Sequence, residues 1–262
     1  MTTRQGLRRV AAVAVMAAFV TGCGGSSSGG GSGGSSNAIT GTVNVFAASS
    51  LTEAFTTLGK QFEAAHPGAH VVFNFGPSSG LSDQINQGAP ADVFASASTK
   101  SMDAVVSAGG AADPTNFAKN VMEVAVPPSN PAHIASVSDL AKASVKVAVC
   151  AADVPCGVAA AQVFANAKLS VKPVTQELDV KSVLAKVELG EVDAGMVYVT
   201  DVRAAGAKVK GIAIDAAVNA TATYPIAALA HTKNQSAAQA FVAYVLSPAG
   251  TAVLSADGFL AP

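Results

Sequence analysis

Short runs of β-branched and apolar residues alternate with alanine-rich helical segments along most of the chain. The expected strands are residues 41–47, 69–75, 92–96, 121–126, 145–150, 171–176, 194–199, 210–214 and 223–230. The expected helices are residues 51–65, 80–88, 99–108, 137–143, 157–168, 179–189 and 235–247. Because strands alternate with helices and do not follow one another as hairpins, the pattern predicts an α/β fold.

The first 22 residues have the pattern of a signal peptide. Three arginines precede an apolar run at residues 10–20, which is followed by Thr21, Gly22 and Cys23. This arrangement is typical of export signals, and the run is too short to serve as a permanent membrane span. A small residue pair directly before Cys23 resembles a bacterial lipobox, which predicts that Cys23 is lipidated. Ordinary secretion, with Cys23 incidental, is the alternative.

A tether is expected between the lipidation site and the folded part. Residues 24–36 are only glycine and serine, a composition that forms a flexible coil and cannot bury a core. Residues 23–39 are therefore expected to hold a globular part close to the outer side of the cell membrane.

The composition of the remainder excludes several classes of protein. About 225 residues follow the tether, enough for one large or two small domains with real cores. Half of the composition is apolar, and the loss of three arginines leaves the chain more acidic than its formal net charge of −1. We therefore expect neither disorder nor nucleic-acid binding outside the tether.

Two cysteines remain in the exported part, Cys150 and Cys156. An oxidising compartment makes a short disulfide between them plausible, and two free thiols packed as small hydrophobic groups are an equal alternative. A zinc site is less expected, since further His or Cys ligands at the usual spacing are missing from the sequence. No side-chain metal site is predicted.

Four strand-to-helix turns open mainly with small or hydroxyl residues. They are residues 48–51, 77–80, 154–157 and 178–181. In parallel α/β sheets such turns gather beyond the carboxyl ends of the strands, where helix N-termini offer unpaired N–H groups and a positive dipole end. The four turns therefore predict an anion-binding crevice.

The serines of these turns have other interpretations. Ser50 and Glu53 have the spacing of a capping box, which would use the Ser50 hydroxyl for the helix start. Ser78 stands in Gly-Pro-Ser-Ser-Gly, the pattern of a hydrolase nucleophile elbow, and a triad with Asp201 and His231 is conceivable. The sequence contains no His-Gly-Gly-Gly oxyanion loop, and Pro77 stiffens the residue before Ser78. A secreted serine hydrolase is the alternative from another class.

Five segments together resemble the molybdate-binding proteins of bacterial molybdate ABC importers. They are "VNVFAASSLTEAF" (43–55), "FGPSSGLSDQINQGAPADVFASAS" (75–98), "KVAVCAADVPCG" (146–157), "ELDVKSVLAKVELGEVDAGMVYVTD" (177–201) and "TYPIAALAHTKN" (223–234). The similarity runs from about residue 40 to the end of the chain. It implies a type II periplasmic-binding-protein fold with two α/β lobes joined by two crossover segments. Lobe one would be residues 40–120 plus 219–262, and lobe two residues 121–218.

The resemblance also implies a function and a ligand set. The protein would bind molybdate or tungstate outside the cytoplasm and deliver it to a membrane permease, as a monomer without catalytic activity or cofactor. The implied ligand groups are hydroxyls and N–H groups of Ser50 and Ser78, the N–H groups of Cys156 and Val180, and the phenol of Tyr198.

Two positions depart from the family's usual residues. Cys156 replaces a small residue such as alanine, which leaves the backbone donor intact, and Pro77 has no N–H to donate. A site made of neutral donors suits fully deprotonated tetrahedral dianions, whereas a protonated phosphate needs an acceptor as well. A sulfate-type oxyanion-binding protein is therefore a further alternative, because only cavity size separates sulfate from molybdate.

Overall fold

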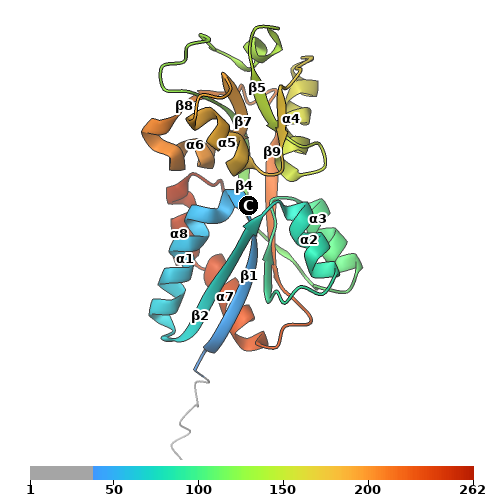
Figure 1. The fold of residues 1–262 in the computed structure, drawn as a ribbon. Helices are drawn as coiled ribbons and strands as arrows, with labels where there is room; N and C mark the ends of the chain where they lie inside the picture. The colour runs from blue at the N-terminus through green and yellow to red at the C-terminus, as the bar shows by residue number, and fades with distance from the viewer. Residues whose placement is uncertain (1–37) are drawn as a thin grey trace, which may run out of the picture. The chain divides into compact units, whose positions relative to one another are not determined.

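The computed structural model describes residues 38–262. The predicted signal peptide, the predicted lipidation site Cys23 and the tether up to residue 37 lie outside the described residues. The described part contains one sheet with the strand order β2-β1-β3-β9-β4-β7-β5-β6, and β8 pairs with β4. Figure 1 shows helices on both sides of this sheet, so the fold is α/β, as the sequence predicts.

Half one of the structure is built around the β2-β1-β3-β9 end of the sheet (Figure 1). Strands β1, β2 and β3 are parallel, and β9 is antiparallel to β3. Its strands are β1 (Thr40–Ala48), β2 (Gly68–Gly76), β3 (Val93–Ala95) and β9 (Thr221–Ala228). Its helices are η1 (Ser49–Leu51, 3₁₀), α1 (Thr52–Ala65), α2 (Ser78–Asn86), α3 (Thr99–Ser107), α7 (Gln235–Leu246) and α8 (Pro248–Asp257).

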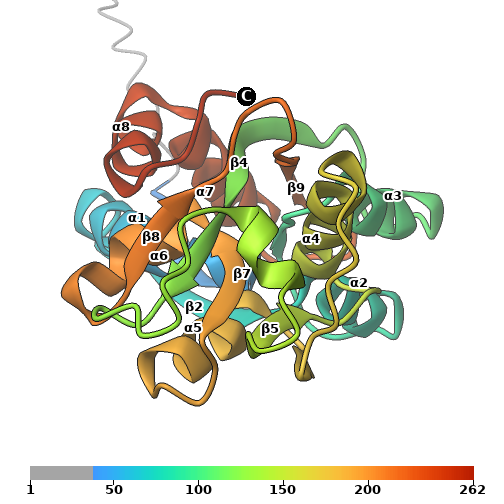
Figure 2. The same cartoon turned by 90° about the horizontal axis from the view of Figure 1, so that it is seen from above.

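Half two is built around the β7-β5-β6 end, and α4 and α5 lie on opposite sides of β5 and β7 (Figures 1 and 2). Its strands are β5 (Val147–Cys150), β6 (Thr175–Glu177), β7 (Ala194–Tyr198) and β8 (Lys210–Ala213). Its helices are η2 (Val137–Ala141, 3₁₀), α4 (Pro155–Asn166), α5 (Val180–Glu188), α6 (Val199–Ala205) and η3 (Gly206–Lys208, 3₁₀).

Strand β4 (Thr115–Val126) belongs to both halves. Its first part pairs with β9 from Thr115 to Val121, and its second part pairs with β7 and β8 from Met122 onward. The chain therefore passes from half one to half two inside a continuous strand, and it returns just before β9 begins at Thr221.

Each half has its own apolar core. In half one, Phe55, Phe62 and Phe241 are fully buried and lie edge to face, with ring centroids 6.2 Å apart for Phe55–Phe241 and 5.3 Å apart for Phe62–Phe241. Burial of a phenylalanine side chain contributes about 1.5 to 3 kcal/mol. In half two, valines such as Val183 and Val187 of α5 pack against the sheet. Half one has a second, smaller apolar cluster around Phe94 and Met102, so the periodic apolar residues form separate cores in the two halves.

Some elements differ from the sequence prediction. Strand β4 begins at Thr115, not at residue 121, because its first part is polar in sequence but pairs with β9. Strand β6 starts only at Thr175, since Pro173 cannot donate to a strand ladder. Residues 137–141 form a 3₁₀ helix, and helices α6 and α8 were not predicted.

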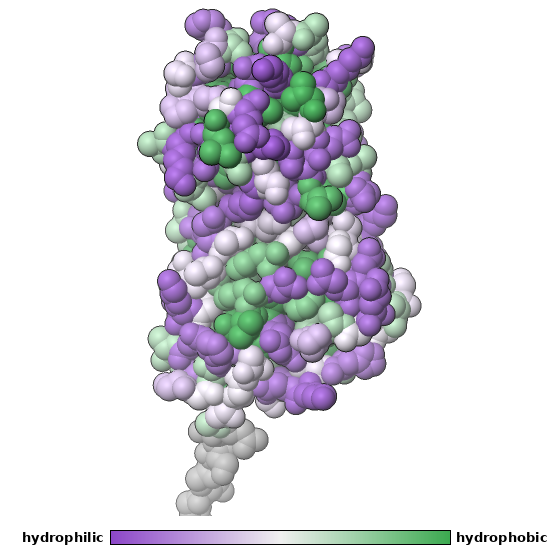
Figure 3. Space-filling view, in the orientation of Figure 1, coloured by the Kyte–Doolittle hydropathy of each residue, from purple (hydrophilic) through white to green (hydrophobic). Residues whose placement is uncertain are grey.

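The surface and the helix lengths complete the description. Figure 3 shows hydrophilic residues over most of the visible face and a hydrophobic area where β1 and β2 lie in Figure 1. In the part of the chain that the structure describes, no single helix is long and apolar enough to cross a membrane. Among the described helices, only α7 and α8 taken together have the length and composition of a membrane span, and they are bent by 59°.

Candidate functional site

A small cavity lies where four turns of the two halves meet. It is lined by Ala48, Ser49, Ser50, Gly76, Pro77, Ser78, Ala97, Val154, Pro155, Cys156, Asp179, Val180 and Tyr198. The structure therefore brings together all five residues that the resemblance implies as ligand groups. Its volume is about 20 Å³, where a single water needs about 10 to 15 Å³, so the cavity suits a compact ligand.

Helix starts supply backbone donors to this cavity. Ser78 and Val180 are the first residues of α2 and α5, and Cys156 is the second residue of α4 after Pro155. The first N–H groups of a helix have no carbonyl partner within the helix, and the dipole makes that end positive. Three helices therefore direct positive ends toward the cavity that their first residues line, which favours an anion there.

Ser50 does not form the capping box that its spacing with Glu53 predicts. Residues 49–51 form a 3₁₀ turn, α1 starts at Thr52, and neither start has a side-chain cap. The Ser50 hydroxyl lies 2.8 Å from the hydroxyl of Tyr224 on β9. Glu53 contacts Lys181 of half two, 128 residues away. Tertiary contacts have therefore replaced the local cap.

Ser78 is held by the backbone of the neighbouring loop. Its hydroxyl oxygen accepts a hydrogen bond of 2.9 Å from the N–H of Ala97, so its own proton is free to be donated. No histidine is among the described residues that line this cavity, and His231 lines a different cavity beside Asp92. Asp201 is paired with Lys181. The residues of the conceivable hydrolase triad therefore do not come together.

Tyr198 places a hydroxyl at the cavity from the end of β7. Its side chain is 1% exposed, and within residues 38–262 its hydroxyl has no hydrogen-bond partner. Burial, followed by the effects of Tyr224 and Asp201, raises the pKa of Tyr198 well above its ordinary value. The phenol therefore stays protonated, and among the described residues it has no acceptor at hydrogen-bond geometry.

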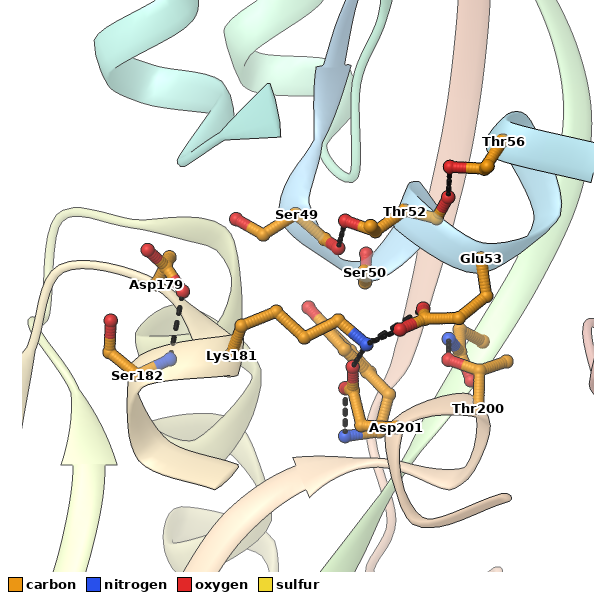
Figure 4. A network of polar contacts seen from close by, with 12 residues as sticks. Ser49, Ser50, Thr52, Glu53, Thr56, Asp179, Lys181, Ser182, Thr200 and Asp201 are labelled. Atoms are coloured by element: carbon orange, nitrogen blue, oxygen red, sulfur yellow. Dashed lines mark hydrogen bonds and ion pairs between the residues drawn. The ribbon is translucent and has the colours of Figure 1, made fainter. Parts of the chain in front are cut away.

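A charged network joins the two halves beside the cavity (Figure 4). The Lys181 ammonium lies 2.8 Å from Glu53 Oε2 and 3.1 Å from Asp201 Oδ1. Asp201 is fully buried, and burial raises its pKa to about 6 although Lys181 acts in the opposite direction. Burial lowers the pKa of Lys181, but Asp201 and Glu53 outweigh it and raise the pKa overall.

This network was missed from the sequence. Lys181 stands in one of the four turns that were singled out for their small and hydroxyl residues, and its side chain extends away from Asp179 toward α1 (Figure 4). Asp179 itself caps α5 by accepting from the Ser182 N–H at 3.0 Å. A lysine directly after the predicted donor Val180 was the available signal, but nothing local shows that its partners are Glu53 and Asp201.

Comparison with known proteins identifies the family. The profile of the bacterial extracellular solute-binding proteins matches residues 43–260. The chain belongs to this family. Membership implies an extracytoplasmic location, in agreement with the export predicted from the N-terminal residues.

The predicted resemblance to molybdate-binding proteins is confirmed by individual relatives within this family. The molybdate-binding protein ModA of Mycobacterium tuberculosis (strain ATCC 25618 / H37Rv) is 43% identical over 222 residues, which cover 84% of this chain and 85% of the relative. The molybdate-binding protein ModA of Haemophilus influenzae is 30% identical over 230 residues, with coverage of 84% and 90%. The periplasmic molybdate-binding protein of Azotobacter vinelandii shares the fold, with a TM-score of 0.76, 22% identity and coverage of 84% and 99%.

A disulfide lies at the wall of this cavity. Cys150 ends β5 and is bonded to Cys156 at the start of α4. Both residues are buried, and the intervening turn contributes Val154 and Pro155 to the cavity wall. In residues 38–262 no group of three or more His, Cys, Asp or Glu side chains could hold a metal ion.

Proposed function

We propose that this chain binds molybdate, and tungstate in the same way, outside the cytoplasm and delivers it to the membrane permease of an ABC importer. The observation that carries the proposal is the buried Tyr198 hydroxyl, a donor without a partner in a cavity where three helices begin. Relatives that bear the name molybdate-binding protein support the choice of anion.

The chemistry of the donors favours a fully deprotonated tetrahedral anion. The proposed ligand groups are the hydroxyls and N–H groups of Ser50 and Ser78, the N–H groups of Cys156 and Val180, and the phenol of Tyr198. A hydrogen bond to a charged group contributes about 1.5 to 3 kcal/mol. A few such bonds, together with the helix dipoles, can offset the desolvation of a dianion, although no arginine or lysine is among the described residues that line the cavity.

Hinge closure would couple binding to a change of shape. In this proposal lobe one comprises residues 40–120 plus 219–262 and lobe two comprises residues 121–218. The two connections would be the middle of β4 and the segment before β9, where the chain passes between halves. Such closure is the usual motion of two-lobed binding proteins around a ligand.

The proposal includes an anchor and a monomeric state. Cys23 would carry the lipid, and the tether would keep the binding part near the permease. Mass spectrometry of the protein purified from its own membrane tests the anchor: a diacylated Cys23 is expected, and an unmodified secreted chain would contradict it. The protein would hydrolyse nothing, and it would use no cofactor and bind no nucleic acid.

Calorimetric titration of the purified residues 38–262 tests the ligand. Molybdate and tungstate are expected to bind tightly, and phosphate weakly. Tyr198→Phe is the variant that removes the unpartnered donor, and Tyr244→Phe, whose hydroxyl bonds to Gln61 far from the cavity residues, is its matched control. Tight binding of sulfate with weak binding of molybdate would favour the sulfate-type alternative. Heat with phosphate alone, or with no anion, would refute the proposal.

A further inference from the structure

Ser50 and Tyr224 form a buried pair of hydroxyls at the cavity. Ser50 is 4% exposed and Tyr224 is fully buried, and their oxygen atoms are 2.8 Å apart. Ser50 lines the cavity, whereas Tyr224 lies behind it on β9. Tyr224 therefore reaches the cavity through two of its lining residues, Ser50 by a hydrogen bond and Tyr198 by an edge-to-face ring contact.

The surroundings of Tyr224 indicate which hydroxyl donates. Among the described residues, Ser50 Oγ is the partner with which the Tyr224 hydroxyl forms a hydrogen bond. Asn120 and Tyr198 lie close enough to affect the pKa of Tyr224, but within residues 38–262 the Asn120 side chain bonds to Thr200 and the Val121 N–H, and the Tyr198 hydroxyl has no hydrogen-bond partner. If Ser50 donated to Tyr224, the phenolic proton would be left buried without an acceptor, which is the costlier arrangement. Burial also raises the pKa of Tyr224, so that proton is retained.

We infer that Tyr224 is a positioning residue that donates its proton to Ser50 and thereby turns the single Ser50 proton toward the ligand. The inference rests on the proposed function and deepens it, because it assigns a source of selectivity. A Ser50 hydroxyl fixed as a donor suits an anion that carries no proton. It cannot readily turn to accept from an anion that carries one, such as hydrogen phosphate.

Ser78 shows the same arrangement with a backbone donor. Its oxygen accepts from the Ala97 N–H, so Ser50 and Ser78, two of the three serines among the described residues that line the cavity, each have a donor behind them. The Ala97 N–H cannot be removed by changing a side chain, whereas the Tyr224 hydroxyl can. Among the described residues that line the cavity, Asp179 is the one carboxylate, and it is the same in the wild-type protein and in every variant proposed below.

The test compares anions of similar size that differ in protonation. Sulfate carries no proton at neutral pH and phosphate carries at least one, so competition of each against molybdate gives a selectivity ratio. In Tyr224→Phe we expect molybdate and sulfate to bind about tenfold more weakly, the equivalent of one hydrogen bond. The affinity for phosphate should be unchanged or higher. The selectivity for sulfate over phosphate should therefore fall about tenfold. Tyr244→Phe should leave all three affinities unchanged.

Two outcomes overturn the inference while the proposed function stands. One is an equal loss for all three anions, which indicates a structural role only, and the other is no change in any affinity. A wild-type protein that binds no molybdate refutes the proposed function itself, and the inference with it. In a Ser50→Ala background, Tyr224→Phe should have no further effect on molybdate binding, because the two act through one contact.

A measurement on the wild-type protein covers the case in which Tyr224→Phe does not fold. With ¹³Cζ-labelled tyrosine, the Tyr224 signal should indicate a donating hydroxyl both without ligand and with molybdate bound. Loss of that donation on molybdate binding would mean that Ser50 donates to Tyr224, which overturns the inference.

Discussion

Replacing Lys181 by methionine tests the charged network between the halves. The substitution keeps the length of an unbranched side chain but removes the ammonium that contacts Glu53 at 2.8 Å and Asp201 at 3.1 Å. Asp201 would then be a fully buried carboxylate without a counter-charge. Breaking a buried ion pair in this way usually costs about 3 to 5 kcal/mol.

The cost at Lys181 should be smaller because Asp201 can take up a proton. Its pKa of about 6 means that protonation at pH 7 costs about 1.4 kcal/mol, one pKa unit. Once Asp201 is neutral, only the pair with Glu53 is lost, and that carboxylate is about half exposed, so its contribution is about 0 to 1 kcal/mol. We expect Lys181→Met to lower the free energy of unfolding by about 2 kcal/mol at pH 7.

The same reasoning fixes the pH dependence. Without Lys181 the pKa of Asp201 rises further, so the variant holds this proton to higher pH than the wild-type protein does. The stability that Lys181 contributes is therefore present above pH 6 and falls as the pH drops through about 6. At pH 5 the difference between the two proteins should be below about 1 kcal/mol.

Urea unfolding at pH 7 and pH 5 measures these differences. Lys186→Met, which removes an exposed contact with Glu191 within half two, is the matched control and should change little at either pH. Asp201→Asn should recover most of the loss at pH 7 when combined with Lys181→Met, since no buried charge remains. A loss of equal size at both pH values would refute the reasoning.

Three other changes have outcomes that follow from single contacts. Replacing Cys150 and Cys156 by serine removes a loop closed over a separation of 6 residues, and thermal or urea unfolding should show a loss of about 2 kcal/mol. Ser78→Ala leaves the Ala97 N–H without its acceptor, and the same measurement should show a loss of about 1 to 3 kcal/mol. Tyr198→Phe should weaken molybdate binding about 10- to 100-fold by calorimetry while stability is unchanged or improved, since an unpaired buried hydroxyl is removed.

Much of the fold could be predicted because its signals are local. The apolar period of α1 and the β-branched runs of β1 and β2 each identify an element without reference to the rest of the chain. The first part of β4 escaped prediction for the opposite reason. Residues 115–120 are largely polar and become a strand only through pairing with β9, about 100 residues later.

The candidate site shows the same division. The turn residues could be named because a strand-to-helix turn predicts a cluster of N–H groups wherever the helix starts. The hydrogen bond of the Ser50 hydroxyl could not be predicted, because its partner Tyr224 is 174 residues away. This bond forms in place of the capping box that the local sequence predicts. The disulfide stood between two equal alternatives, because five intervening residues do not determine whether two thiols meet.

Within the proposed closing motion, two groups of contacts act in opposite directions. The ion pair of Glu53 and Lys181 joins the two halves without using the groups that would hold the anion. Two features disfavour a closed cavity without ligand. One is the Tyr198 hydroxyl, which has no partner among the described residues and whose burial costs about 1 to 3 kcal/mol. The other is the positive ends of the three helices whose first residues line the cavity. An anion supplies the acceptor for Tyr198 and the counter-charge for the helix ends at once. Anion binding and closure would therefore be coupled through groups that carry no formal charge. Lys181, beside the cavity, would shift the equilibrium between the open and the closed form.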